Sequence, residues 1–243
     1  MSAPGDVPAF YVSPPHPCGY LPGRDAVTLF LDPTTRADVT IYTRLARYGF
    51  RRSGAHLYRP RCPGCQACVP VRLPVAAYQP NRSQRRCARG NRDLRLDTAP
   101  FRFDAAQFAL YRRYMAWRHP GSAMDDADPD HYMACFASDW CASEALTWYD
   151  GDNLLAVAIL DRLGDALSAV YTFFEPEEAA RGLGNLAVLQ QVAMAHEAEL
   201  EWVYLGYWIR DCAKMSYKIG LRPLEWFDEG RWRRLEAGAP APF

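Results

Sequence analysis

The sequence is poor in lysine and has no long hydrophobic run. Of its 28 basic residues only Lys214 and Lys218 are lysines. No apolar stretch reaches the roughly 18 residues of a transmembrane helix, and the proline-rich start lacks the hydrophobic core of a signal peptide. We therefore expect a cytoplasmic protein without a membrane partner, whose cysteines are thiols, metal ligands or redox groups rather than disulfides.

Acidic residues are scarce in one block of the chain. Between residues 36 and 102 there are 15 arginines and no lysine, against three acids, Asp38, Asp93 and Asp97. The formal net charge of the whole chain is zero, so the rest is correspondingly acidic. Because a guanidinium fits phosphates and carboxylates bidentately, the block favours an anionic partner, with nucleic acid first, over a merely solubilising face.

The length of 243 residues allows one large or two modest domains. We expect a cysteine- and arginine-rich N-terminal region, residues 1–100, and a C-terminal region, residues 101–243. In the first region, local patterns predict a helix capped by Thr34 or Thr35 and an edge strand interrupted by prolines. The full expectation there is a strand 26–31, a helix 36–48, a hairpin 50–60 that turns at Ser53-Gly54, the edge strand 69–76 and a helix 82–90.

The second region favours an α+β fold. Asp104 is a candidate N-cap for a helix that carries residues 108–117, and a helix 131–136 follows. The patterns then predict strands 145–149, 154–160 and 167–174, a helix 186–200, a strand 201–205, a helix 211–219 and a strand 222–228. This order resembles the GNAT acyltransferase fold, a mixed, largely antiparallel sheet with flanking helices. That fold usually places Arg or Gln three residues before a glycine pair that binds acyl-CoA. Ala179 occupies that place before Gly182 and Gly184, which counts against acyl-CoA.

Three cysteines, Cys62, Cys65 and Cys68, lie three residues apart, and Pro63-Gly64 between the first two favours a turn. With Cys18 they could form a tetrahedral zinc site or anchor an iron–sulfur cluster. The chain lacks the second, separated C-x-x-C pair of a zinc ribbon, so a metal site and packed free thiols stay equally open. The remaining thiols are expected in the core: Cys87, Cys135, Cys141 and Cys212.

The stretch 204–218 contains both lysines. On an α-helix residues four apart share a face, so Lys214 and Lys218 are expected to point the same way. Aromatic side chains interleave with them and offer stacking surfaces for an unpaired nucleic acid end: Tyr204, Tyr207, Trp208 and Tyr217. The alternative is a solvated helix whose lysines extend along its surface.

Four motifs together resemble the arginyl-tRNA–protein transferase family, specifically its bacterial aspartate/glutamate leucyltransferase branch. They run in the same order over about residues 8–230: Cys18-Gly-Tyr-Leu-Pro, Tyr58-Arg-Pro with Cys62-Pro-Gly-Cys-Gln-Ala-Cys, Asn81-Arg-Ser-Gln-Arg-Arg, and Tyr204-Leu-Gly-Tyr with Cys212-Ala-Lys-Met-Ser-Tyr-Lys. The resemblance implies transfer of leucine from Leu-tRNA to proteins that begin with Asp or Glu. Such products enter N-end-rule degradation.

An aminoacyl ester is already activated, so this reaction requires no cofactor. The enzyme must orient the acceptor amine and stabilise the developing oxyanion. We expect Tyr207 near the leaving 3′-oxygen and Arg85, Arg86 and Lys214 at the acceptor carboxylate. The residues expected at the tRNA are Arg82, Arg89, Tyr217 and Lys218. Three alternatives stay open: Arg-tRNA as donor, a CoA-dependent N-acetyltransferase, and a non-catalytic tRNA-binding module.

Overall fold

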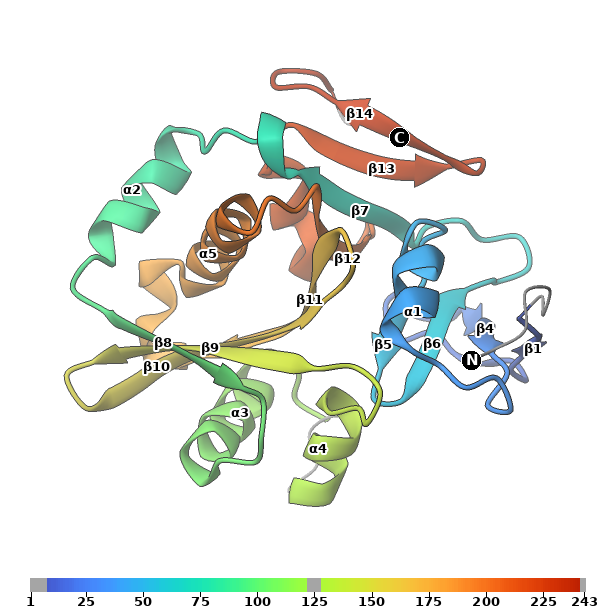
Figure 1. The fold of residues 1–243 in the computed structure, drawn as a ribbon, viewed down its shortest axis with the longest axis horizontal. Coiled ribbons are helices and arrows are strands. Elements are labelled where there is room, and N and C mark those ends of the chain that lie inside the picture. The colour runs from blue at the N-terminus through green and yellow to red at the C-terminus, as the bar shows by residue number, and fades with distance from the viewer. Residues whose placement is uncertain (1–7, 122–127, 241–243) are drawn as a thin grey trace.

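Two β-sheets organise the protein. The computed structural model describes residues 8–121 and 128–240 (Figure 1). The large sheet has the order β14-β13-β7-β12-β11-β10-β9-β8, and a four-stranded sheet has the order β1-β4-β6-β5. A third, two-stranded sheet pairs β2 with β3. The protein is therefore α+β with a largely antiparallel sheet, as the sequence predicts.

The small sheets come from the N-terminal part of the chain. Their strands are β1 (Phe10–Val12), β2 (His16–Pro17), β3 (Asp25–Ala26), β4 (Thr28–Leu31), β5 (Arg51–Ser53) and β6 (His56–Pro60). The large sheet contains β7 (Val69–Pro74), β8 (Arg95–Pro100), β9 (Ser143–Asp150), β10 (Asn153–Arg162), β11 (Ala166–Phe174), β12 (Trp202–Trp208), β13 (Leu224–Asp228) and β14 (Arg231–Leu235).

Helices cover both faces of the large sheet. The α-helices are α1 (Val39–Ala46), α2 (Arg82–Gly90), α3 (Ala105–Arg118), α4 (Pro129–Phe136) and α5 (Leu183–Glu197). Three short 3-10 helices complete the set: η1 (Val75–Ala77), η2 (Pro176–Arg181) and η3 (Ala213–Gly220). The sheet curves around α5, while α3 and α4 lie beyond its other face (Figure 1). In the described residues, no helix is both long enough and apolar enough to cross a bilayer.

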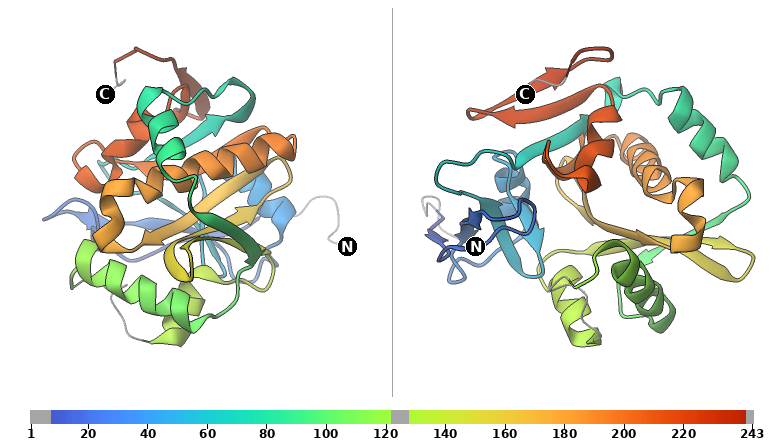
Figure 2. Two further views of the ribbon diagram at one scale, coloured as in Figure 1. Left: turned by 90° about the vertical axis from the view of Figure 1, so that its left-hand side faces the viewer. Right: turned by 180° about the vertical axis from the view of Figure 1, so that it is seen from behind.

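Alternating side chains of β12 show what lies on each face. Val203 and Leu205 pack in one core cluster with residues of α5, whereas Tyr204 between them packs with α1 and the four-stranded sheet. Helix α2 lies alongside α5 (Figure 2). Consequently α2 and α5 share one face of the large sheet, and the four-stranded sheet lies on the opposite face.

A buried ion pair joins the four-stranded sheet to the large one. Arg52 of β5 donates to Asp161 of β10 through Nε at 2.8 Å and Nη2 at 2.6 Å, and both side chains are fully buried. Arg52 also donates to the carbonyls of Phe136 and Gly54, each at 2.9 Å, so its donors are satisfied. The large sheet includes β7 and β8, which both lie within residues 1–100. The boundary at that residue stays a prediction.

Several local expectations are confirmed: the hairpin of β5 and β6, helix α2, and α3 with Asp104 as its N-cap. The expected cap of α1 is wrong. Asp38 caps this helix by accepting from the Ile41 amide at 2.7 Å, whereas Thr34 donates to Asp32. A carboxylate directly before the first turn accepts the free amides there, so the helix begins at Val39.

The expected edge position of β7 is also wrong, because this strand lies between β13 and β12. Two prolines in one strand favour an edge position, because proline cannot donate a ladder hydrogen bond. However, β13 pairs only with Val71 and Arg72, so Pro70 and Pro74 lie outside that ladder and need not donate to it. Strands β8 and β14 were not predicted.

Candidate active site

The large sheet opens between its two parallel strands. β11 and β12 pair at only three positions: Ala166–Trp202, Leu167–Val203 and Ser168–Tyr204. Directly after these, between Tyr204 and Gly206, the pairing of β12 with its other neighbour, β7, shifts register. Beyond this point the strands diverge. We call the cluster of side chains at this point the divergence cleft and define it by Arg51, Tyr20, Tyr58, Tyr207, Tyr217 and Lys218.

Arg51 of β5 reaches into the cleft from the four-stranded sheet. Its Nη2 donates to the carbonyl of Ala169, the first β11 residue beyond the parallel pairing. Gly206 makes room on the other strand, since a Cβ there would lie 2.1 Å from Arg51 Nη1. The φ of Gly206 is +79°, a conformation that glycine adopts readily. The guanidinium therefore lies between the backbones of the two diverging strands.

Tyrosine hydroxyls surround this guanidinium. Burial raises the pKa of Tyr20, Tyr58 and Tyr207, and the charge of Arg51 opposes each shift. Tyr20 is 38% exposed as a residue, yet the protein encloses its hydroxyl. Burial likewise raises the pKa of Tyr217 to about 12, although the residue is 44% exposed. At neutral pH these hydroxyls stay protonated and offer hydrogen bonds without negative charge.

Lys218 is the second cation of the cleft and is only 6% exposed. Its Nζ donates to the carbonyl of Tyr207 at 2.6 Å and contacts Met215 Sδ at 3.4 Å. Burial and then the charge of Arg51 lower the pKa of Lys218 to about 7. Among the described residues no carboxylate forms an ion pair with either cleft cation. The cleft is thus cationic and lacks its own counter-ion.

The two lysines do not share a face, so that expectation is wrong. η3 is a 3-10 helix with about three residues per turn, which rotates residues four apart away from each other. Lys214 is exposed and its Nζ lies 2.9 Å from Nδ1 of His119 at the end of α3. Burial, followed by the charge of Lys214, lowers the pKa of His119 to about 4, so the neutral ring accepts from the ammonium.

Tyr207, the expected catalytic hydroxyl, points away from solvent. Its hydroxyl donates to the carbonyl of Gly49 at 3.0 Å, with the Tyr58 carbonyl at 3.4 Å. Tyr204 and Trp208 of the same strand are also buried, so of the four expected stacking aromatics only Tyr217 is exposed.

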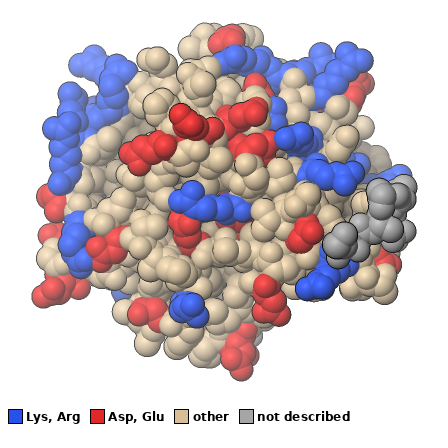
Figure 3. Space-filling model, in the orientation of Figure 1, with Lys and Arg blue, Asp and Glu red and all other residues tan. Residues whose placement is uncertain are grey.

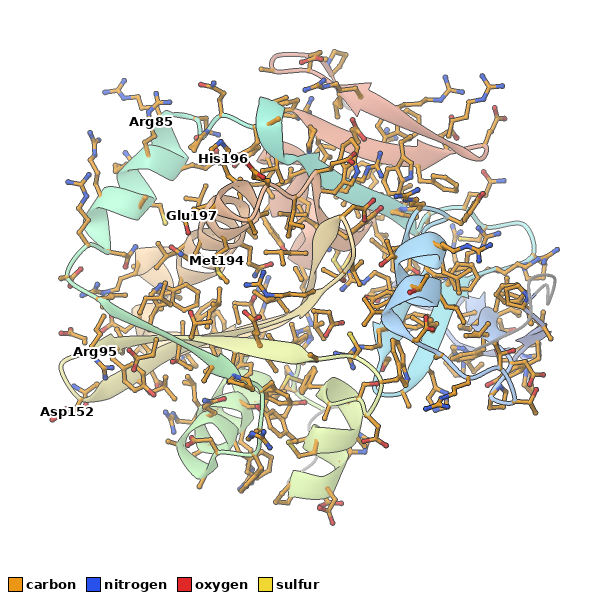
Figure 4. All side chains as sticks on the ribbon, in the orientation of Figure 1. Arg85, Arg95, Asp152, Met194, His196 and Glu197 are labelled. Carbon is orange, nitrogen blue, oxygen red and sulfur yellow. The ribbon has the colours of Figure 1, made fainter. Side chains whose placement is uncertain are left out.

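The arginines of α2 form a basic surface, which we call the α2 stripe. Asn81 and Gln84 cap the helix reciprocally, and Gln84 is its one buried residue. Basic side chains gather over α2 in Figure 3, and Figure 4 shows Arg85 pointing away from the core. The exposed members are Arg82, Arg85, Arg86 and Arg89. Because α2 lies on the α5 face, the structure does not bring Arg85 and Arg86 into the divergence cleft.

Three cysteines line a groove of about 660 Å³ beside the end of β12. Cys62, Cys65 and Cys68 lie on its wall next to Tyr207, Trp208 and residues of β13. Burial and then the neighbouring thiols of Cys18, Cys62 and Cys65 raise the pKa of Cys68 to about 12, which places the four sulfurs in one neighbourhood.

The described side chains do not form the expected metal site. In residues 8–121 and 128–240, no group of three or more His, Cys, Asp or Glu side chains is placed to hold a metal ion. Cys62 Sγ accepts from the Val27 amide and Cys18 Sγ from the Leu21 amide, both at 3.4 Å. The residues as arranged do not fit a tetrahedral site.

Sequence reasoning missed Arg51 as a site residue. Nothing in the chain distinguishes it from the other arginines of the basic block, because its place depends on how two sheets pack. Tyr20 and Tyr58 had a usable signal, since each belongs to one of the motifs that carry the family resemblance.

These features define a class of protein. A sheet that diverges around two unpaired cations, with a basic helix on the other face, is suited to anionic substrates or partners. The chain matches the family described as "Arginine-tRNA-protein transferase, N terminus" over residues 16–86 and its "C terminus" counterpart over residues 106–228. The protein belongs to the arginine-tRNA–protein transferase family.

Relatives named "Aspartate/glutamate leucyltransferase" are similar over nearly their whole length. The Nitrosococcus oceani protein is 47% identical over 228 residues, which cover 93% of this chain and 96% of the relative. The Pseudomonas fluorescens SBW25 protein is 47% identical over 226 residues, covering 93% and 96%.

Two solved structures are more distantly similar. FemX has a TM-score of 0.43 at 10% identity, covering 72% of this chain and 61% of that chain. The C-terminal domain of a putative lysylphosphatidylglycerol synthetase from Agrobacterium fabrum has a TM-score of 0.42 at 15% identity, covering 60% of this chain and 47% of that one. The present chain thus spans less than two thirds of either structure.

Proposed function

We propose that this protein transfers leucine from Leu-tRNA to the N-terminal α-amine of proteins that begin with Asp or Glu. The observation that carries the proposal is 47% identity, over almost the entire chain, to a relative of that name. The product is a protein marked for N-end-rule degradation, so the downstream partner is the degradation machinery. Since charged tRNA is the donor, the proposed place of the reaction is the cytoplasm.

The cleft favours leucine over arginine as the donated residue. An arginyl side chain entering it would add a third cation beside Arg51 and Lys218, where no described carboxylate pairs with either. An unpaired buried charge is costly, whereas leucine brings none.

The geometry also favours a GNAT-like architecture without acyl-CoA. Support for the architecture comes from the order β9, β10, β11, α5, β12 and from the divergence of the parallel pair. In GNAT enzymes the loop before the long helix binds CoA phosphates. Here α2 packs on that loop: Cys87 Sγ donates to the carbonyls of Arg181 and Gly182, and Asn91 Nδ2 donates to Arg181 at 3.0 Å. A helix thus lies where acyl-CoA would approach.

The proposed roles follow the placement of the side chains. The α2 stripe binds tRNA phosphates, and all four of its arginines are available because they are exposed. Tyr217 is better placed than Tyr207 to donate to the leaving 3′-oxygen, since Tyr207 already donates to the Gly49 carbonyl. Tyr207 then acts as a positioning residue, whose carbonyl holds Lys218. Lys218 is too buried for a direct phosphate contact.

One experiment separates this function from its rivals. An Asp-starting peptide is incubated with the protein and Leu-tRNA, Arg-tRNA or acetyl-CoA in parallel, and the product is weighed by mass spectrometry. We expect a leucyl adduct without ATP or CoA. Preferential arginine incorporation when the two tRNAs compete would show that the donor is wrong. An acetyl adduct would show a CoA-dependent enzyme, and tRNA binding without any product would show a binding module.

A further inference from the structure

The divergence cleft contains two cations, Arg51 and Lys218, and among the described residues no carboxylate forms an ion pair with either. Such a site suits an anionic ligand. We propose that the guanidinium of Arg51 binds the side-chain carboxylate of the acceptor's N-terminal residue. The inference rests on the proposed function.

Arg51 has donors to spare. Within the described residues its one hydrogen bond goes from Nη2 to the Ala169 carbonyl, which leaves Nε and Nη1 without protein acceptors. The residue is partly exposed, so a ligand in the cleft can reach it. A planar fork matches a carboxylate better than an ammonium does, and enclosure strengthens the attraction.

The earlier candidates for this role fit less well. Lys214 already donates to the neutral ring of His119 at the surface. Arg85 donates to the Pro80 carbonyl and lies on the α5 face with Arg86. A carboxylate bound to such exposed cations would gain little, because water and salt screen the interaction.

The test of this inference measures acceptor selection. Binding and kcat/KM are compared for peptides that differ only in Asp or Asn at the first position. Arg51→Gln should reduce the Asp-over-Asn preference roughly 10- to 100-fold, and Arg51→Lys should retain part of it, because a charge-assisted contact is lost or weakened. Arg95→Gln, an exposed arginine paired with Asp97, is the matched control and should behave as wild type. Equal losses for both peptides would show that Arg51 only holds the strands apart, and would overturn the inference.

The binding measurement in this test needs no tRNA. Wild-type protein that binds Asp peptides selectively but transfers no leucine would therefore refute the proposed function and leave the Arg51 inference standing.

Discussion

The guanidinium of Arg72 stacks on the ring of Trp202, with Cζ 3.5 Å from the ring centroid. Trp232 covers it at 4.1 Å, and Arg72 Nε donates to Glu225 at 2.9 Å. One buried arginine of β7 thereby contacts β12, β13 and β14. This contact set explains why a strand with two prolines lies inside the sheet rather than at its edge.

Replacing Arg72 with lysine keeps the positive charge. It removes the planar guanidinium that stacks on Trp202 and Trp232 and the pair of N–H groups that faces Glu225. We expect Arg72→Lys to lower the free energy of unfolding by about 2 kcal/mol, as for a buried network that loses partners. Arg95→Lys is the control, since Arg95 lies over Tyr149 on the surface, and it should stay within about 0.5 kcal/mol. Urea unfolding measures both, and equal effects would contradict the buried contribution.

Gly206 is expected to be intolerant of a side chain. Gly206→Ala places a Cβ 2.1 Å from Arg51 Nη1 at a φ of +79°. The backbone conformation alone costs about 1–2 kcal/mol, and the clash adds to it. Because Arg51→Ala removes the clashing atoms, the double variant should be more stable than the sum of the single effects predicts, by about 1 kcal/mol. Strict additivity in a double-mutant cycle of unfolding free energies would contradict this contact.

The sequence predicts what local signals determine and misses what tertiary packing decides. Asp104 and Gly54 mark a helix start and a hairpin turn because caps and turns depend on neighbouring residues. The burial of Lys218 depends on η3 being a 3-10 helix. The four-residue spacing of Lys214 and Lys218 does not show whether the helix is of the α or the 3-10 type. Arg51 is placed by contact between two sheets, for which one sequence carries no local signal. The charged strand β14 lacks the alternation that identifies strands.

The cysteine arrangement predicts thiols rather than a metal centre. We expect the protein, purified without chelator, to contain much less than one zinc or iron per chain. Cys65→Ser should change its unfolding free energy by less than about 1 kcal/mol, whereas structural zinc contributes on the order of ten. Elemental analysis and thermal unfolding of both proteins provide the check. Stoichiometric metal that is lost in Cys65→Ser would establish the metal site instead.

The α2 stripe is predicted to bind phosphate. Each of Arg82→Ala, Arg85→Ala, Arg86→Ala and Arg89→Ala should weaken binding of every tRNA alike and reduce the salt dependence of log K by about one unit per lost contact. The preference for Asp over Asn acceptors should persist in all four. Affinity is measured over a range of salt concentrations, with Arg95→Ala as the control. Loss of acceptor preference in Arg85→Ala or Arg86→Ala would return the carboxylate site to α2.

Lys218 should make stability depend on pH. Its pKa is about 7 in the folded protein against 10.5 ordinarily, so between these values the unfolded chain binds a proton that the folded chain does not. The unfolding free energy that Lys218 contributes should therefore rise with pH from about 7 upward, by at most about 1.4 kcal/mol per unit. Below pH 7 both states are protonated and burial of the charge is fully destabilising.

Lys218→Met should accordingly gain stability relative to wild type at pH 6 and lose that advantage by pH 9. Exposed Lys214→Met serves as the control, since removing a solvated ammonium should change the curve little. Chemical denaturation at several pH values gives the curves, and parallel curves for wild type and Lys218→Met would mean that Lys218 stays charged in the folded protein.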